Sequence, residues 1–457
     1  MRTLIVLHGW SDNATSFEPL AGWLRGQGFD VVGIWLGDYL SMNDEVSLYD
    51  LGNAFRRALD FHKIPQARHS FDLITHSTGG LVAREYLRQS CVDENGEPDA
   101  VRAPIAHLCM LAPANFGSPL ANLGKSVIGR FFKGWDWNHF AESGKQVLDA
   151  LELAAPYSFW LGVDDLFRAG YRIFAPENTF TTVMVGTISY PGIKSVMHEN
   201  GSDGTVRVST ANLNATYLSV DFADANASPK PVAKPRVNPD IAFAVFHRNH
   251  GSITKAVPDK DSPELAQVES WQKTLLDALR LEPGDYSTHA ARCSAITDQT
   301  FVEGRQGPNP DWYHRYQHVV FRVHDQFGNS IPDYVIEFYQ QDRDDDDRVM
   351  EFIHKEIVEK VHTNAIDHGY RSFLIDTDDL IEFIDKHDAE VCMSITAAHV
   401  SRRIRYRNPE HGFRVFTKTN RGMLHPNEPI LVNITLYRDP DVENPDPALN
   451  VFRLLPA

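Results

Sequence analysis

A serine at the end of an apolar stretch is the residue best suited to nucleophilic chemistry in this chain of 457 residues. Residues 72–80 read Asp-Leu-Ile-Thr-His-Ser-Thr-Gly-Gly, which predicts a strand, a sharp turn with Ser77 at its tip, and a helix. Such a turn lifts the hydroxyl clear of the sheet, where a base and a substrate carbonyl can both reach it. The turn favours small residues two positions before and after the serine. Gly79 meets this requirement, whereas Thr75 stands where the G-x-S-x-G pattern has glycine.

Two backbone N–H groups are expected to stabilise the oxyanion that forms when a serine attacks a carbonyl. Residues 3–10 predict a buried strand that ends in His-Gly-Trp. The loop after this early strand is predicted to supply the Trp10 N–H, with Gly9 allowing close approach. The second donor is predicted to be Thr78, the residue after the nucleophile.

An orienting carboxylate is expected after a later strand. Thr179 to Val185 is rich in β-branched residues, and His-Glu-Asn-Gly-Ser-Asp-Gly-Thr-Val follows at 198–206. Asp203 lies between glycines in this loop. An Asp-Gly pair is also an ordinary turn signal, but the position of the pair in the series of motifs favours a carboxylate that orients an imidazole. Glu199 and Asp221 are the weaker candidates.

The general base is expected last, before the closing helix. Ile241 to Phe246 is another apolar run, and His-Arg-Asn-His-Gly-Ser-Ile follows it. His250 precedes a glycine at a predicted loop tip and is favoured as the base. His247 continues the strand and is interpreted as structural. His76, beside the serine, is interpreted as a packing residue.

Together these motifs resemble the α/β-hydrolase fold, and within it the bacterial lipases and esterases, over residues 1–282. The family order of serine, aspartate and histidine matches Ser77, Asp203 and His250. The resemblance implies ester hydrolysis without a redox cofactor. It is carried by Leu-His-Gly-Trp-Ser at 7–11, Thr-His-Ser-Thr-Gly-Gly-Leu-Val at 75–82, Ala-Asn-Phe-Gly-Ser-Pro-Leu-Ala at 114–121, Gly-Ser-Asp-Gly-Thr-Val at 201–206 and Asn-His-Gly-Ser-Ile at 249–253.

The elements that must position these residues alternate between strand and helix. This alternation predicts a doubly wound, mostly parallel sheet with helices on both faces. The remaining elements expected in it are helices at 17–26, 48–62 and 263–279 and strands at 31–36 and 105–111.

More than sixty residues separate the strand ending near Ala112 from the one starting at Thr179, where the core fold needs a single helix. We predict a helical cap insertion at about 115–178. Its large apolar side chains suit either the core of an ordinary subdomain or an acyl pocket over Ser77. The predicted substrate-binding residues are Phe116, Phe131, Phe132, Trp135 and Trp137.

The alternation of predicted strands and helices ends after residue 282. Short alternating strands at 318–324, 334–339, 390–395, 413–416 and 430–437 predict a β-sandwich-like domain at 283–457, with a helical interruption near 378–387. We interpret it as an accessory domain. The acidic run at 342–347 favours a solvated loop, since it lacks the glycine and the distal glutamate of a calcium loop.

Composition limits the classes of partner. A net charge of −17 disfavours nucleic acid, whose binding requires positive charge. The four cysteines are far apart and predict neither a disulfide framework nor a zinc site. No signal peptide or apolar run of transmembrane length is visible, so the sequence predicts a cytoplasmic protein, with export by a signal-less route left open.

The sequence therefore predicts a serine hydrolase of carboxylic esters, with a small ester or a lipid as its substrate. A phospholipase or membrane-targeting lipolytic effector, making transient contact with a lipid surface, is the alternative. A binding protein that keeps the fold without activity is the least favoured hypothesis, because the set of candidate catalytic residues is complete and in the family order.

Overall fold

The computed structural model describes residues 2–8, 17–35, 44–123, 144–190, 199–223, 229–258, 263–340, 350–398, 404–408, 412–416, 418 and 421–440. The chain forms two compact units. The N-terminal unit comprises Met1–Ala215, Pro235–Tyr316 and Asn427–Pro429, and the C-terminal unit comprises Thr216–Lys234, Gln317–Pro426 and Ile430–Ala457. The boundary expected at residue 282 thus differs from the division in the structure, which keeps the next helix in the N-terminal unit.

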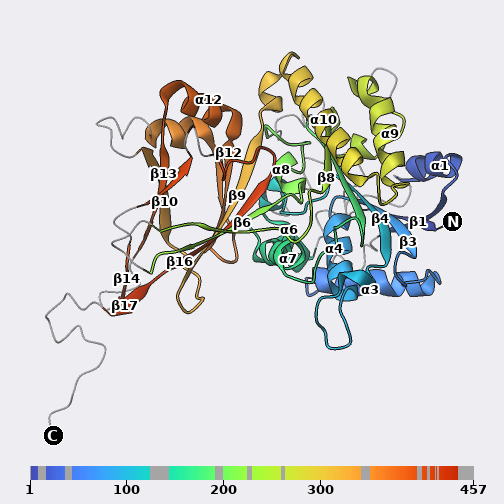
Figure 1. The fold of residues 1–457 in the computed structure, drawn as a ribbon, viewed down its shortest axis with the longest axis horizontal. Helices are drawn as coiled ribbons and strands as arrows, with labels where there is room; N and C mark the ends of the chain where they lie inside the picture. Colours follow the sequence, from blue (N-terminus) through green and yellow to red (C-terminus); the bar gives the residue numbers. More distant parts are fainter. Residues whose placement is uncertain are drawn as a thin grey trace, which may run out of the picture. The chain divides into compact units, whose positions relative to one another are not determined.

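The N-terminal unit is built on one parallel sheet, as the alternation of elements predicts. Among the described residues this sheet has six strands in the order β2-β1-β3-β4-β5-β8, with every neighbouring pair parallel (Figure 1). Because β2 and β3 lie on opposite sides of β1, the strand order reverses there. Ligands of open α/β sheets bind beyond the carboxyl ends of the strands at such a reversal. The strands are β1 (Thr3–His8), β2 (Asp30–Trp35), β3 (Phe71–His76), β4 (Ile105–Leu111), β5 (Phe180–Gly186) and β8 (Ala242–Phe246).

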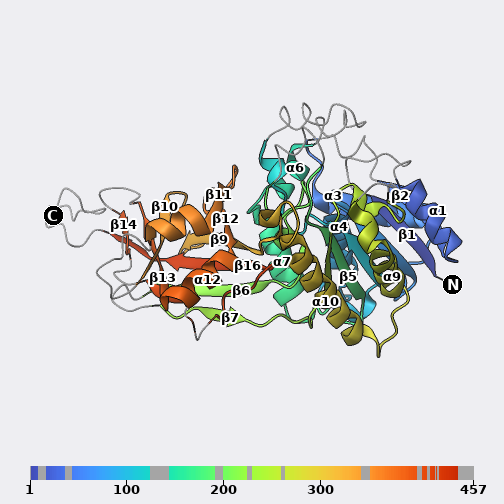
Figure 2. The same ribbon diagram turned by 90° about the horizontal axis from the view of Figure 1, so that it is seen from above.

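Helices cover both faces of this sheet. Helices α3 and α4 lie on one side, and α1, α9 and α10 lie on the other (Figure 1 and Figure 2). The amphipathic pattern predicted at 48–62 forms α3, which buries its leucines and Phe55 and begins at a capping box of Ser47 and Asp50. The helices are α1 (Glu18–Gly26), α3 (Leu48–Phe61), α4 (Gly79–Ser90), α6 (Lys145–Leu151), α7 (Pro156–Phe167), α8 (Val208–Ala211), α9 (Val268–Ala278) and α10 (Tyr286–Arg305).

The C-terminal unit is rich in β-structure, in agreement with the prediction. Its described strands form a three-stranded sheet, β10-β13-β15, a six-stranded sheet, β11-β12-β9-β16-β6-β7, and the pair β14-β17. One apolar core joins side chains of the two larger sheets to Leu380 and Ile384 of α12 (Thr377–His387), the predicted helical interruption. The strands are β6 (Thr216–Asp221), β7 (Val232–Lys234), β9 (Tyr316–Asp325), β10 (Tyr334–Gln340), β11 (Val358–Thr363), β12 (Tyr370–Asp376), β13 (Val391–Ala397), β14 (Ile404–Tyr406), β15 (Phe413–Phe416), β16 (Pro429–Leu436) and β17 (Arg438–Pro440).

Strands β6 and β7 come from the first half of the chain but belong to the C-terminal sheet. β6 pairs in parallel with β16, and β7 pairs antiparallel with β6. Residues 223–240 are polar and rich in proline, a composition that predicts a loop. The structure instead places β7 within it, because Leu218 and Val220 of β6 are buried in the C-terminal core and bring this segment to the sheet.

All four cysteines are buried thiols. Burial raises the pKa of Cys91 and of Cys293 to about 12, so both are protonated at neutral pH. In the described part of the chain, no helix combines the length and the apolar character needed to span a bilayer. The acidic run at 342–347 lies outside the described residues.

Candidate active site

Ser77 lies in a strained turn directly after β3. Its φ of +54° is in the left-handed region, which residues other than glycine rarely adopt. The Ser77 N–H donates to the carbonyl of Leu111 at 3.1 Å, and the Ser77 carbonyl accepts from the Gly80 N–H at 3.0 Å. The residue is half-buried at the carboxyl edge of the sheet. Strain of this kind is typical of a functional residue that surrounding contacts hold in place.

Small residues make room for this turn. A Cβ on Gly79 would lie 2.9 Å from the carbonyl oxygen of Leu7, and one on Gly80 would lie 2.7 Å from Cβ of Pro113. Thr75, the departure from the glycine pattern, is fully buried. Its Cβ would be 3.5 Å from a Cβ on Gly79, an ordinary contact distance, so the turn accommodates threonine at this position.

The structure brings His250 and Asp203 together. The Nδ1–H of His250 donates to Oδ2 of Asp203 at 2.8 Å, and the His250 backbone N–H donates to the Asp203 carbonyl at 3.0 Å. The hydrogen-bond pattern assigns the proton to Nδ1, because a carboxylate only accepts. Nε2 of His250 is buried and has no hydrogen-bond partner among the described residues. Nε2 is therefore an available acceptor, to which no described residue, Ser77 included, donates a hydrogen bond in this structure.

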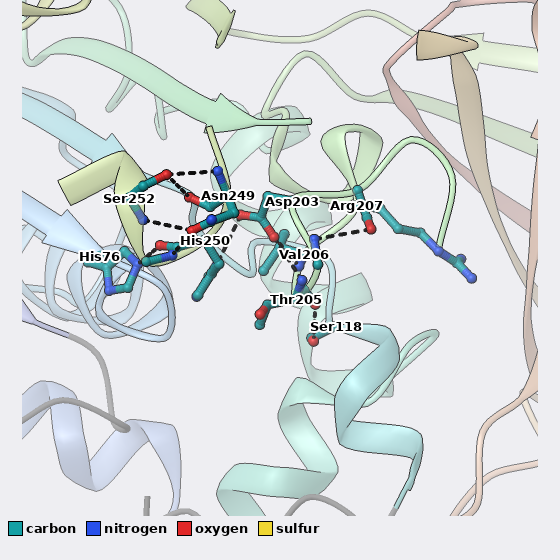
Figure 3. Close-up of polar contacts among 12 residues, drawn as sticks. His76, Ser118, Asp203, Thr205, Val206, Arg207, Asn249, His250 and Ser252 are labelled. Atoms are coloured by element: carbon teal, nitrogen blue, oxygen red, sulfur yellow. Dashed lines mark hydrogen bonds and ion pairs between the residues drawn. The ribbon is translucent and has the colours of Figure 1, made fainter. Parts of the chain in front are cut away.

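Asp203 is fully buried and held by its own loop. Its Oδ1 accepts from the backbone N–H groups of Thr205 at 2.9 Å and Val206 at 2.7 Å, while Oδ2 faces His250 (Figure 3). The flanking Gly204 has a φ of +89°, which glycine adopts without strain. Each carboxylate oxygen thus has a donor, and the carboxylate orientation is fixed.

No protein-family model and no curated protein sequence matches this chain. Among solved structures, phospholipase PlaB from Legionella pneumophila is similar over the whole length: it is 25% identical with a TM-score of 0.78, and the match covers 100% of this chain and 97% of that chain. The same phospholipase in complex with thio-NAD is 26% identical with a TM-score of 0.77 and the same coverage of both chains. The similarity includes the parallel sheet that carries Ser77, Asp203 and His250.

The chain has the α/β-hydrolase fold. Its fold is that of serine lipases and esterases, as the motifs predict.

The weaker candidates for the acid are engaged elsewhere in this α/β-hydrolase. Both oxygens of Glu199 accept from the guanidinium of Arg207, at 2.6 and 2.8 Å. Asp221 ends β6 in the C-terminal unit and accepts from the N–H of Ala223 at 2.9 Å. Of the three candidates, Asp203 is the one whose carboxylate contacts His250.

His247, the rival base, is held by other groups. Its Nδ1 lies 2.8 Å from the hydroxyl of Tyr313, and its backbone N–H donates to Oε1 of Gln267 at 2.8 Å. Burial lowers the pKa of His247, although the carboxylate of Glu303 acts in the opposite direction. These contacts fit the structural role predicted for this residue.

The loop that carries His250 is more tightly organised than its sequence indicates. Oδ1 of Asn249 accepts from the N–H groups of Gly251 and Ser252, at 3.1 and 2.9 Å (Figure 3). The buried guanidinium of Arg248 donates to the carbonyls of Ser252 and Lys255 and lies 4.6 Å from the ring centroid of Trp271. The Asn249 turn could have been recognised from its sequence, since asparagine often caps its own turn. The contact of Arg248 with Trp271 of α9 depends on tertiary packing.

One of the two predicted oxyanion donors lies within the described residues of the α/β-hydrolase. Thr78 is 3% exposed and precedes α4, whose first amide groups lack acceptors within the helix. Its N–H therefore belongs to a helix N-terminus, where negative charge is stabilised. Trp10 and Gly9 lie outside the described residues.

The described part of the insertion comprises η2 (Pro119–Leu123), α6 and α7. Phe116, a predicted pocket residue, is 1% exposed, and the guanidinium of Arg84 lies 5.4 Å from its ring centroid. The Ser118 hydroxyl donates to the Thr205 carbonyl at 2.5 Å and so ties the start of the insertion to the Asp203 loop. The other predicted pocket residues, Phe131, Phe132, Trp135 and Trp137, lie outside the described residues.

Proposed function

We propose that this α/β-hydrolase cleaves carboxylic esters with Ser77 as nucleophile, His250 as general base and acid, and Asp203 as the orienting carboxylate. The observation that carries the proposal is the Asp203–His250 pair, in which Nδ1 is engaged and Nε2 is left as a buried acceptor. The strained turn of Ser77 at the carboxyl edge of the same sheet supports the nucleophile assignment.

In the first half of the reaction, His250 Nε2 takes the proton of the Ser77 hydroxyl as its oxygen attacks the ester carbonyl. The negative charge on the former carbonyl oxygen is stabilised by the N–H of Thr78 and, by analogy with the family, by that of Trp10. When the tetrahedral intermediate collapses, His250 returns the proton to the leaving alcohol and the acyl group stays on Ser77.

Water completes the cycle. His250 removes a proton from water as the water attacks the acyl-enzyme, and the acid leaves when Ser77 regains its proton. Asp203 holds the imidazole in the tautomer that keeps Nε2 free to accept and stabilises the imidazolium in both halves.

We propose glycerophospholipid acyl esters as the substrate class. The support is the similarity to a phospholipase over the full length, the C-terminal unit included. The aromatic-rich sequence of the insertion also suits an acyl chain. A soluble esterase, which would act on short-chain esters in solution, is the competing assignment.

The test compares the wild-type protein with Ser77→Ala on phosphatidylcholine vesicles and on a chromogenic short-chain ester. We expect the variant to lose about 10³-fold or more in kcat on both substrates, because the nucleophile is gone. The matched control is Ser90→Ala, at the far end of α4, the helix that follows Ser77; this variant should retain wild-type activity.

Each remaining outcome decides between the hypotheses. Full activity in Ser77→Ala would overturn the nucleophile assignment. Turnover of the soluble ester without release of fatty acid from vesicles would favour a soluble esterase. A wild-type protein that neither turns over an ester nor reacts with a fluorophosphonate probe would be a binding protein.

A further inference from the structure

His76 is a second buried imidazole beside the candidate base. It is the last residue of β3, directly before Ser77, and is 2% exposed. Its sequence position predicts a packing role in the turn. Its contacts in the structure involve the base itself.

The contact between the two histidines is both polar and apolar. His76 Nε2 lies 3.0 Å from the backbone carbonyl oxygen of His250, and the two ring centroids are 4.6 Å apart at an interplanar angle of 42°. Because a carbonyl only accepts, Nε2 of His76 must carry a hydrogen. The ring of Phe17 packs against His76 at a centroid distance of 5.5 Å.

This contact links two separate parts of the sheet. Asp203 holds His250 from the acid loop, through the His250 ring and its backbone N–H. His76 holds the carbonyl of the same residue from strand β3, so His250 lies between the two (Figure 3). Since a single peptide bond joins His76 to Ser77, the hydrogen bond from His76 couples the position of the His250 loop to that of the Ser77 turn.

We propose that His76 is a positioning residue. It donates to the His250 carbonyl and packs against the His250 ring, and so holds the imidazole of His250 in a fixed position relative to Ser77. The proposal rests on the proposed function and deepens it. Catalysis by an oriented base is sensitive to displacement, and a shift of about 1 Å can lower the rate about 100-fold. His76 acts through His250 and takes no proton from the substrate.

The experiment compares His76→Phe with His76→Gln. Phenylalanine keeps an aromatic ring against Phe17 and His250 but cannot donate, whereas the amide nitrogen of glutamine can replace Nε2. We expect His76→Phe to lower kcat about 10- to 100-fold with KM within about twofold of wild type. We expect His76→Gln to recover most of kcat. Activity is normalised to the active-site concentration, titrated with a fluorophosphonate.

His107→Gln is the matched control for the loss of a buried histidine. His107 is also 2% exposed, lies 2.8 Å from Asp72 and stacks on Phe180, but it belongs to β4, and its partners among the described residues include none of the candidate catalytic residues. We expect it to lower the melting temperature and leave kcat per titrated site unchanged. If His76→Phe does not fold, His76→Leu provides the same loss of the donor in a smaller side chain.

The outcomes separate this proposal from the proposed function. Wild-type kcat in His76→Phe, alongside an inactive Ser77→Ala, would overturn the positioning role and leave the hydrolase assignment standing. A His76→Gln variant that folds but is as impaired as His76→Phe would also overturn it, because the donor would then not matter. Full activity in Ser77→Ala would instead overturn the proposed function.

Discussion

Two imidazoles three residues apart, His247 and His250, differ in what surrounds their ring nitrogens. His247 has a tyrosine hydroxyl at Nδ1 and the Glu303 carboxylate 3.6 Å from Nε2. His250 has a carboxylate at Nδ1 and no hydrogen-bond partner for Nε2 within the described residues. A general base needs an available acceptor, so the environment of His250 is the one suited to proton transfer.

Substituting each histidine by glutamine tests this difference. We expect His250→Gln to reduce kcat by about 10³-fold or more, because the amide cannot act as a base at neutral pH. His247→Gln should keep kcat within about threefold, since its contacts are structural, although loss of the Tyr313 contact should lower stability. Initial rates on the short-chain ester and thermal melts of both variants provide the readout. The reverse pattern of rates would assign the base to His247.

The motifs around Ser77, Asp203 and His250 were recognisable because each is a local signal: a short strand followed by a turn of suitable residues. The contacts of His76 and Arg248 were not predicted. His76 reaches a carbonyl 174 positions away in the sequence, and no local pattern records which carbonyl a side chain will meet.

Helix α4, which follows the candidate nucleophile Ser77, is anchored by a buried ion pair. Nε and Nη2 of Arg84 donate to the two oxygens of Asp165 on α7, at 2.8 and 3.0 Å, and Nη1 donates to the carbonyl of Asn115 at 2.9 Å. Both charged side chains are completely buried. Burial raises the pKa of Asp165, although the guanidinium opposes this shift. The pair joins α4 to α7 of the insertion.

Removing one partner of the ion pair should therefore lower the stability of the protein far more than removing both partners. We expect Arg84→Met to lower the free energy of unfolding by about 3–5 kcal/mol, because it leaves a buried carboxylate unpaired. Arg84→Met combined with Asp165→Leu should recover a large part of that loss. Urea denaturation followed by circular dichroism measures both. Equal destabilisation of the single and the double variant would contradict this account of the pair.

The longer elements of the sheet in the N-terminal unit followed from sequence periodicity, whereas several strands of the C-terminal unit did not: β6, β7, β11, β12, β14 and β17. β11 exposes most of its residues and includes Glu359, Lys360 and His362, so its sequence does not read as an apolar strand. Its identity as a strand comes from its antiparallel pairing with β12. An edge strand of this kind is determined more by its neighbour than by its own side chains.

At the scale of the whole molecule, the chain passes between its two units more than once. Residues 216–234 leave the N-terminal unit to complete the C-terminal sheet, and residues 427–429 return to it. A division at one point in the sequence, such as residue 282, therefore cannot describe the molecule. A chain truncated at that position would leave β6 and β7 without the strand β16 that pairs with β6.

Acid should destabilise the molecule through His289, a buried residue of helix α10, which packs against the parallel sheet. His289 is 4% exposed, and its Nε2 lies 3.0 Å from the Thr182 hydroxyl, while Arg292 donates to Nδ1 at 3.1 Å. Burial, reinforced by the charge of Arg292, lowers the pKa of His289 to about 4. In the unfolded chain its pKa returns to about 6.5.

Between these two pKa values the unfolded chain binds a proton that the native protein does not, so stability rises with pH in this window. The contribution is fully present above about pH 6.5 and is lost as the pH falls toward 4, by about 2 to 3 kcal/mol. We expect the free energy of unfolding of His289→Gln, which keeps a donor for Thr182, to fall less steeply than that of the wild type as the pH is lowered. Urea midpoints from pH 7.5 to 4.5 measure this, and identical pH slopes in both proteins would rule out His289 as the cause.

The sequence by itself determined the parallel sheet, the turn at Ser77 and the order of the candidate catalytic residues, because these depend on periodicity and turn chemistry within a few residues. Tertiary structure decided which side chains meet. The Asp203–His250 contact joins residues 47 positions apart, and the His76–His250 contact joins residues 174 apart. Such contacts depend on how the strands are ordered in the sheet, and so does the place of β6 and β7 in the C-terminal unit.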